Sequence, residues 1–230
     1  MPGRRSLARF LDALEMRYGP PEPPPSREPF ALVLWENVAY LVNDERRAAA
    51  FAALGKQIGW TPERILAAPA RLLRGVAALG GMLPDERVGK LLRAAEVAQK
   101  RFGSDLAAVV CQPFLRARKA LMAFPGIGEP GAEKILLFAG AHPVLALDSN
   151  ALRVLIRLGF GEEKKSYAAT YRSAQEAAKR ELRDELGALL RAHLLLRRHG
   201  QELCRRNRPQ CADCPVAEGC AFYRAAVGSR

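Results

Sequence analysis

Apolar residues recur at every third or fourth position along most of the chain, which is the spacing of one face of an α-helix. No segment alternates between apolar and polar residues in the manner of a half-buried strand. We therefore predict an all-α fold. The clearest helical segments are LARFLDALEMRYG, RAAAFAALGKQIG, ERVGKLLRAAEVAQKRF, ALRVLIRLGF and LGALLRAHLLLRRHG.

Prolines mark the predicted helix starts and one connection. The pairs Thr61-Pro62 and Pro84-Asp85 are typical of a helix start. Amide protons in the first turn of a helix have no partner within the helix, so proline, which has none, is tolerated there. Residues 20–29 (PPEPPPSREP) are rich in proline. We expect them to form a stiff, extended connection after a first helix.

The charge of the chain favours a polyanionic partner. There are 36 Lys and Arg against 24 Asp and Glu, a net charge of +12 that is distributed along the whole length. Nucleic acid is preferred over a membrane, because no apolar run approaches the roughly 20 residues that span a bilayer. A cationic surface that is merely solvated stays open as an alternative.

Four of the five cysteines form a C-x6-C-x2-C-x5-C array, namely Cys204, Cys211, Cys214 and Cys220. Residues 1–10 do not resemble a secretory signal, so we expect a cytoplasmic, nucleoid-associated protein, in which disulfides are disfavoured. Structural zinc commonly uses two C-x2-C pairs, whereas this array has one, so a [4Fe-4S] cluster fits better and zinc stays open. Cys111 lies in an apolar stretch and is expected to pack in the core.

The cysteine array is interleaved with arginines. Arg205, Arg206 and Arg208 lie between the first two cysteines. A metal-bound loop would present them to DNA phosphates with little loss of conformational freedom.

A second informative segment, residues 117–140, contains Phe124-Pro125-Gly126-Ile127-Gly128 between two helical runs. It predicts a helical hairpin. The glycines allow a tight turn, and the amides that open the second helix can then approach a phosphate oxygen, which makes Gly126, Ile127 and Gly128 candidate phosphate contacts. A simple turn is the alternative.

Asp148 follows an apolar segment and immediately precedes an amphipathic helix. Aspartate is a preferred N-cap residue, and capping is its plainest role. A capping carboxylate beside the positive end of a helix also stays ionised, so Asp148 is a candidate catalytic residue.

In combination, the PGIG hairpin, the aspartate after it, His199-Gly200 and the cysteine array resemble the endonuclease III branch of the helix-hairpin-helix DNA glycosylases. The resemblance implies a helix-barrel domain at residues 28–143 and an iron-sulfur cluster domain made of residues 1–27 and 144–230. Between them would lie a groove for double-stranded DNA with a damaged or mismatched base. It further implies a monomeric enzyme of base excision repair.

The sequence departs from the strand-cleaving members of this family at one position. Their lyase lysine lies two residues after the last hairpin glycine, where this chain has Pro130. Proline has no amine with which to form a Schiff base. A monofunctional glycosylase is therefore predicted. Lys134 and Lys119 remain as substitute nucleophiles, although phosphate contacts or surface charges suit them better.

Monofunctional members use a glutamate on a buried helix, and Glu36 in PFALVLWENVAYLVN resembles it in placement. It is the only ionisable residue of an apolar segment, so desolvation should favour its neutral form, which could protonate a leaving base or position a water. A structural glutamate paired with an arginine or with helix amides is the alternative. Tyr40, one helical turn later, could stack on a flipped base or pack in the core.

The predicted reaction begins with extrusion of a poorly paired base, which is the cheapest base to flip. Glu36 would assist departure of the base, and Asp148 would stabilise the positive charge on the sugar. A glycosylase with lyase activity and a non-catalytic, DNA-binding or redox-sensing protein remain as alternatives. The substrate stays open among mismatched uracil or thymine, deaminated purines and alkylated purines. Removal of adenine opposite oxidised guanine is disfavoured. Family members with that activity usually carry an extra C-terminal recognition domain, whereas few residues follow Cys220 here.

Overall fold

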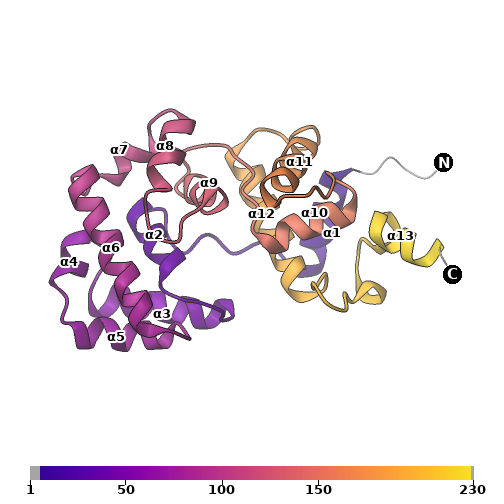
Figure 1. The fold of residues 1–230 in the computed structure, drawn as a ribbon. Coiled ribbons are helices and arrows are strands. Elements are labelled where there is room, and N and C mark those ends of the chain that lie inside the picture. The colour runs from indigo at the N-terminus through magenta and orange to yellow at the C-terminus, as the bar shows by residue number, and fades with distance from the viewer. Residues whose placement is uncertain (1–5, 229–230) are drawn as a thin grey trace. The chain divides into compact units, whose positions relative to one another are not determined.

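The protein is all-helical, as predicted. The structure, a computed structural model, describes residues 6–228 (Figure 1). Residues 1–5 and 229–230 of the predicted cluster domain lie outside the described residues. Within the described part of the chain, the only strand-like pairing is an isolated bridge between Tyr40 and Gly81. None of the described helices is long and apolar enough to cross a membrane.

The chain divides into two compact units. One unit comprises Pro24–His142, and the other combines the two ends of the chain, up to Pro23 and from Pro143 onward. The proline-rich stretch leads from one unit into the next and contains no helix before Pro29, as expected of an extended connection.

The continuous unit is built around α2, whose residues Pro29 to Leu34 are all buried. This helix contacts α3, α6, α7 and α9. Thr61 caps α4, and Pro62 and Pro84 open α4 and α6 as predicted. The helices of this unit are α2 Pro29–Asn37, α3 Asp44–Gln57, α4 Pro62–Ala67, α5 Ala70–Leu79, α6 Pro84–Phe102, α7 Leu106–Val110, α8 Phe114–Leu121 and α9 Glu129–Phe138.

The discontinuous unit packs the N-terminal helix against the C-terminal part of the chain. Helices α10 and α12 approach each other closely at Gly200, which has no side chain: a Cβ atom there would lie 2.8 Å from Cβ of Asn150. The elements are α1 Leu7–Tyr18, α10 Ser149–Leu158, α11 Tyr167–Lys179, α12 Leu186–Glu202, the 3-10 turns η1 Cys211–Asp213 and η2 Ala217–Gly219, and α13 Ala221–Gly228.

Two sequence predictions are wrong at the level of local structure. Helix α2 ends at Asn37, so Tyr40 is not on the helix of Glu36. Its amide donates instead to the carbonyl of Gly80 at 2.9 Å, which places it in the bridge with Gly81. Cys111 is exposed and does not pack in the core, because the apolar run ends with α7 and Cys111 follows it in a turn.

Candidate functional site

Helices α8 and α9 form the predicted helical hairpin. Gly126 in the turn has φ of 71°, a conformation that disfavours other residues, and a Cβ atom there would lie 3.1 Å from Oδ1 of Asn37 at the end of α2. Gly128 is the N-cap of α9, and Ile127 between the glycines is 5% exposed. The buried isoleucine anchors the turn, while the amides at the start of α9 have no side-chain cap.

An arginine compensates the acidic residues at the start of α9. Nη1 of Arg118, on α8, lies 2.5 Å from Oε1 of Glu129 and 2.9 Å from Oε1 of the buried Glu133. This bridge ties the two helices of the hairpin together. Lys119, its neighbour, is exposed, as expected for a surface charge.

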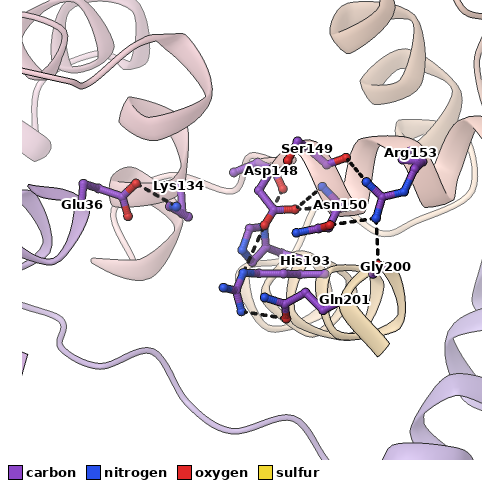
Figure 2. A network of polar contacts seen from close by, with 12 residues as sticks. Glu36, Lys134, Asp148, Ser149, Asn150, Arg153, His193, Gly200 and Gln201 are labelled. Atoms are coloured by element: carbon purple, nitrogen blue, oxygen red, sulfur yellow. Dashed lines mark hydrogen bonds and ion pairs between the residues drawn. The ribbon is translucent and has the colours of Figure 1, made fainter. Parts of the chain in front are cut away.

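Glu36 lies on the last turn of α2, where it meets Lys134 of α9. Lys134 Nζ is 2.9 Å from Glu36 Oε2, and the two side chains are only 15% and 16% exposed (Figure 2). Glu36 is the only ionisable residue of its own segment, but a lysine from another helix pairs with it, as in the alternative of a paired, buried glutamate. Lys134 is mostly buried, so it is not the surface charge that was one of the two roles expected for it. The partner of Glu36 is a lysine, where an arginine or helix amides had been the alternatives.

Asp148 caps α10, as predicted. Its Oδ1 accepts hydrogen bonds from the amides of Asn150 at 2.9 Å and Ala151 at 2.8 Å. Its Oδ2 lies 3.1 Å from Nε of Arg197, a residue of α12. The carboxylate is thus fixed from both sides, and its side chain keeps 21% of its surface exposed.

The surroundings of Asp148 are built by α11 and α12. Nδ1 of the fully buried His193 lies 2.7 Å from the carbonyl oxygen of Ala146, which fixes the segment leading to the cap. Tyr167, at the start of α11, is half exposed. Burial, and then the charge of Asp148, raise the pKa of Tyr167 above its ordinary value.

A basic groove of about 1070 Å³ opens beside the start of α10. Arg153 and Arg157 are engaged by backbone carbonyls of the cysteine loop or of α12, whereas Arg205 and Arg206 are exposed. Arg208 is exposed but does not line the groove. The lining includes Ser149, Asn150, Arg153, Arg157, Lys164, Lys165, Tyr167, Arg205 and Arg206.

The four cysteines of the array line one cavity of the discontinuous unit. The other walls are mostly apolar and include Val154, Leu158, Leu203 and Val216. Within residues 6–228, no group of three or more His, Cys, Asp or Glu side chains is gathered closely enough to hold a metal ion.

The chemistry of this donor set suits a cationic centre. Burial and the charges of the other three thiolates raise the pKa of Cys214 to about 11. Burial, and then the charges of Cys204 and Cys220, also raise the pKa of Cys211. Thiolates that disfavour one another's ionisation are stabilised together when they bind a metal. The sulfur atoms do not converge on a single ion, but in type and number they suit an iron-sulfur cluster, in which each cysteine binds a different iron.

Two side chains from the helices face the cysteine sulfur atoms. Nη1 of Arg157 lies 3.4 Å from Sγ of Cys204, and Nε2 of His199 lies 3.6 Å from Sγ of Cys214. His199 is 1% exposed, and burial lowers its pKa to about 4. Its Nδ1 is 2.9 Å from the hydroxyl oxygen of Tyr18, on α1.

Several known proteins resemble this chain in sequence or in fold. No protein-family model matches the sequence. The endonuclease III of Sulfolobus acidocaldarius is 28% identical over 200 residues, which are 86% of this chain and 84% of that protein. With several other relatives called endonuclease III, the chain aligns over only about half of their length.

Solved structures extend the likeness over nearly the whole fold. A trapped endonuclease III–DNA covalent intermediate has a TM-score of 0.75 at 20% identity, covering 96% of this chain and 97% of that one. A thermostable thymine-DNA glycosylase also has a TM-score of 0.75, at 18% identity, covering 95% of both chains.

The protein is a homologue of the endonuclease III-like helix-hairpin-helix DNA glycosylases. Enzymes of this class act in base excision repair by cleaving the N-glycosidic bond between a base and its sugar.

The sequence did not predict which side chains contact Glu36, Asp148 and His199 in this glycosylase homologue. Lys134, Arg197 and Tyr18 each belong to an element distant in sequence from the residue they contact, so periodicity carries no signal for them. The close helix contact at Gly200, in contrast, could have been predicted from the sequence. A glycine inside the apolar pattern of a long helix indicates a close approach of another helix, which here is α10.

Proposed function

We propose that this glycosylase homologue is monofunctional: it hydrolyses the N-glycosidic bond of a flipped, damaged or mispaired base and leaves an abasic site. The observation that carries the proposal is the lack of a free lysine amine on α9, the second helix of the hairpin, all of whose residues the structure describes. Pro130 occupies the position of the lyase lysine, and Lys134 Nζ is engaged by Glu36 at 2.9 Å. An ammonium group bound to a carboxylate is a poor nucleophile, since Schiff-base formation needs the free amine.

Asp148 is proposed to stabilise the positive charge that develops on the deoxyribose as the bond to the base breaks. Two helix amides and Arg197 fix the carboxylate, so little reorganisation accompanies the reaction. The 21% of its side-chain surface that stays exposed leaves room for a substrate to approach.

The ion pair of Glu36 suggests a different role for this residue from direct protonation of the base. An ionised carboxylate accepts hydrogen bonds and lacks a proton to donate. We therefore assign Glu36 to orienting the attacking water, with Lys134 holding the carboxylate in place.

DNA contact is assigned to the hairpin turn and to the cysteine loop. The amides around Gly126, Ile127 and Gly128 would bind phosphate oxygens. Exposed Arg205, Arg206 and Arg208 would neutralise further phosphates and make binding salt-dependent. Tyr40, which is 49% exposed, is assigned to stacking on a base.

Cys204, Cys211, Cys214 and Cys220 are proposed to hold a [4Fe-4S] cluster. When bound, it would cross-link the loop through iron–thiolate bonds and so stabilise the discontinuous unit. The hydrolysis itself needs no electron transfer, since water and two carboxylates suffice for it.

A panel of duplexes tests the proposal and names the substrate. Each duplex carries one lesion, such as uracil, a thymine mismatch, hypoxanthine, an alkylated purine or an oxidised pyrimidine. Strand breaks that appear only after alkali establish a monofunctional glycosylase. Breaks without alkali, together with a covalent adduct trapped by borohydride, would instead establish lyase activity and point to Lys134. Tight binding without any product would indicate a non-catalytic protein.

A further inference from the structure

A hydrogen-bonded path runs from the N-terminal helix to one cysteine of the array. The hydroxyl oxygen of Tyr18 lies 2.9 Å from Nδ1 of His199, whose Nε2 lies 3.6 Å from Sγ of Cys214. His199 is 1% exposed, so water does not compete for either nitrogen. The path joins α1 and α12 to the cysteine loop within one unit of the protein.

The protonation of the cysteine sulfur determines which way the hydrogen bonds run, because the Tyr18 hydroxyl can donate or accept, whereas a cysteine bound to iron has no proton to donate. When the Tyr18 hydroxyl donates to Nδ1, the hydrogen of the neutral imidazole resides on Nε2 and faces Cys214. A doubly protonated ring also carries a hydrogen on Nε2. The remaining tautomer would direct a nitrogen lone pair at an electron-rich sulfur atom. When Cys214 is bound to iron, His199 therefore donates an N–H···S hydrogen bond to it, and the Tyr18 hydroxyl, by donating to Nδ1, supports the tautomer that does so.

Tyr18 is held firmly enough for this role. Arg198 of α12 lies over its ring, with 5.0 Å between Cζ and the ring centroid, and donates from Nη1 to the Tyr18 carbonyl at 2.9 Å. Burial, followed by the charges of Glu202 and Cys214, raises the pKa of Tyr18 above its ordinary value, so the hydroxyl keeps its proton.

Arg157, the other side chain that donates to a cysteine of the array, also binds the backbone of the loop. Arg157 lies 3.4 Å from Sγ of Cys204, but the same guanidinium donates to the carbonyls of Arg205 at 2.7 Å and Arg206 at 3.1 Å. Its removal would disturb the fold of the loop. The phenol of Tyr18, in contrast, touches the array only through His199, so its effect on the sulfur can be isolated.

We propose that Tyr18 and His199 are positioning residues that raise the reduction potential of the cluster held by the four cysteines. The inference rests on the proposed [4Fe-4S] cofactor. Reduction adds negative charge to the ligating sulfur atoms, so an N–H···S hydrogen bond stabilises the reduced state more than the oxidised one. Docking of α1 thereby sets the redox behaviour of a site formed near the other end of the chain.

Protein-film voltammetry of the purified holoprotein tests the proposal. Tyr18→Phe keeps the ring and removes the hydroxyl, and we expect a lower midpoint potential. A tenfold change in the reduction equilibrium corresponds to about 59 mV for a one-electron couple. The matched control is Arg191→Met, which removes the contacts of α12 with Asp12 and Glu15 of α1 but leaves the path intact. Its midpoint potential should equal that of the wild type.

Substitutions of His199 separate the hydrogen bond from packing. His199→Gln keeps an N–H donor and should stay near the wild-type potential, whereas His199→Leu should fall with Tyr18→Phe. Iron–sulfur stretching frequencies from resonance Raman spectra give a second readout and should shift in the variants that lose the donor. Iron-loaded Tyr18→Phe with unchanged potential and frequencies would overturn the inference but not the cofactor. An iron-free wild-type protein would overturn both.

Discussion

The two candidate carboxylates are held in different ways. Asp148 is fixed mainly by its own helix: two amides of the first turn of α10 donate to one oxygen, and Arg197 contacts the other. Glu36 lies at the other kind of helix end, in the last turn of α2, where Lys134 of α9 contacts it. The positive end of a helix favours an anion, while the negative end disfavours it. The carboxylate of Asp148 is therefore stabilised by its own helix, whereas Glu36 lies at the unfavourable end of α2 and is held by Lys134.

This contrast suggests a division of labour. A carboxylate with a fixed orientation and a fixed charge suits electrostatic stabilisation of a cation. A carboxylate held by one neighbouring lysine suits the positioning of a water molecule and the acceptance of its proton. The predictions below test each side of this comparison.

We expect the largest effect on stability when the proposed cluster is lost from the unit that contains Asp148. Cys211→Ser should remove the brown iron chromophore and destabilise that unit, because iron–thiolate bonds contribute to its folding. Amide exchange in α10 and α12 should accelerate, while exchange in α2 and α9 should stay unchanged. Exposed Cys111→Ser is the matched control and should keep its colour. A colourless, zinc-loaded wild type would refute the iron-sulfur assignment.

Asp148→Asn should lower the rate of base release by about 10²- to 10³-fold, because it removes a fixed charge aimed at the developing cation. Asparagine caps helices as well as aspartate does, so the fold should persist. DNA affinity, measured by fluorescence anisotropy, should be unchanged or higher. Single-turnover rates equal to those of the wild type would remove Asp148 from catalysis.

Glu36→Gln should lower base release by about 10²-fold, the lower end of the range for acid-base groups. Lys134→Met should lower it by a similar factor, since it leaves a mostly buried carboxylate without its partner. If the two residues act as a pair, the double variant will be no worse than either single one, with a coupling energy of about 0.5–3 kcal/mol. Strictly additive effects would argue against a functional pair.

The smallest expected effect concerns the support of Asp148 by α12. Gly200→Ala would push a Cβ atom to 2.8 Å from Asn150, and it should destabilise the protein by about 1–3 kcal/mol through overpacking. Gly187→Ala, on the same helix, meets nothing within 4 Å and should stabilise by about 0.5–1 kcal/mol. Urea denaturation measures both. Equal effects of the two substitutions would show that the contact between α10 and α12 yields easily.

Helices, caps and turns were predictable from the sequence wherever they depend on residues that are close together in the chain. Apolar spacing predicts α1, α3, α6, α10 and α12, because each helix must bury one face. The capping role of Asp148 follows from the residues on either side of it, and the hairpin follows from Gly126 and its neighbours. The cysteine array was visible because its members are close in sequence. The early end of α2 was not visible, since the competing hydrogen bond of Tyr40 comes from Gly80, in another loop.

The sequence by itself determined the helical class, the hairpin, the cap at Asp148 and the cysteine array, because backbone geometry and near neighbours fix all of these. Only the tertiary structure decided which groups surround them: Lys134 beside Glu36, Arg197 beside Asp148, and Tyr18 behind His199. The charge, orientation and tautomer of a side chain depend on partners brought together by packing. The residue types of the site were therefore readable from the chain, whereas their chemical states came from the fold.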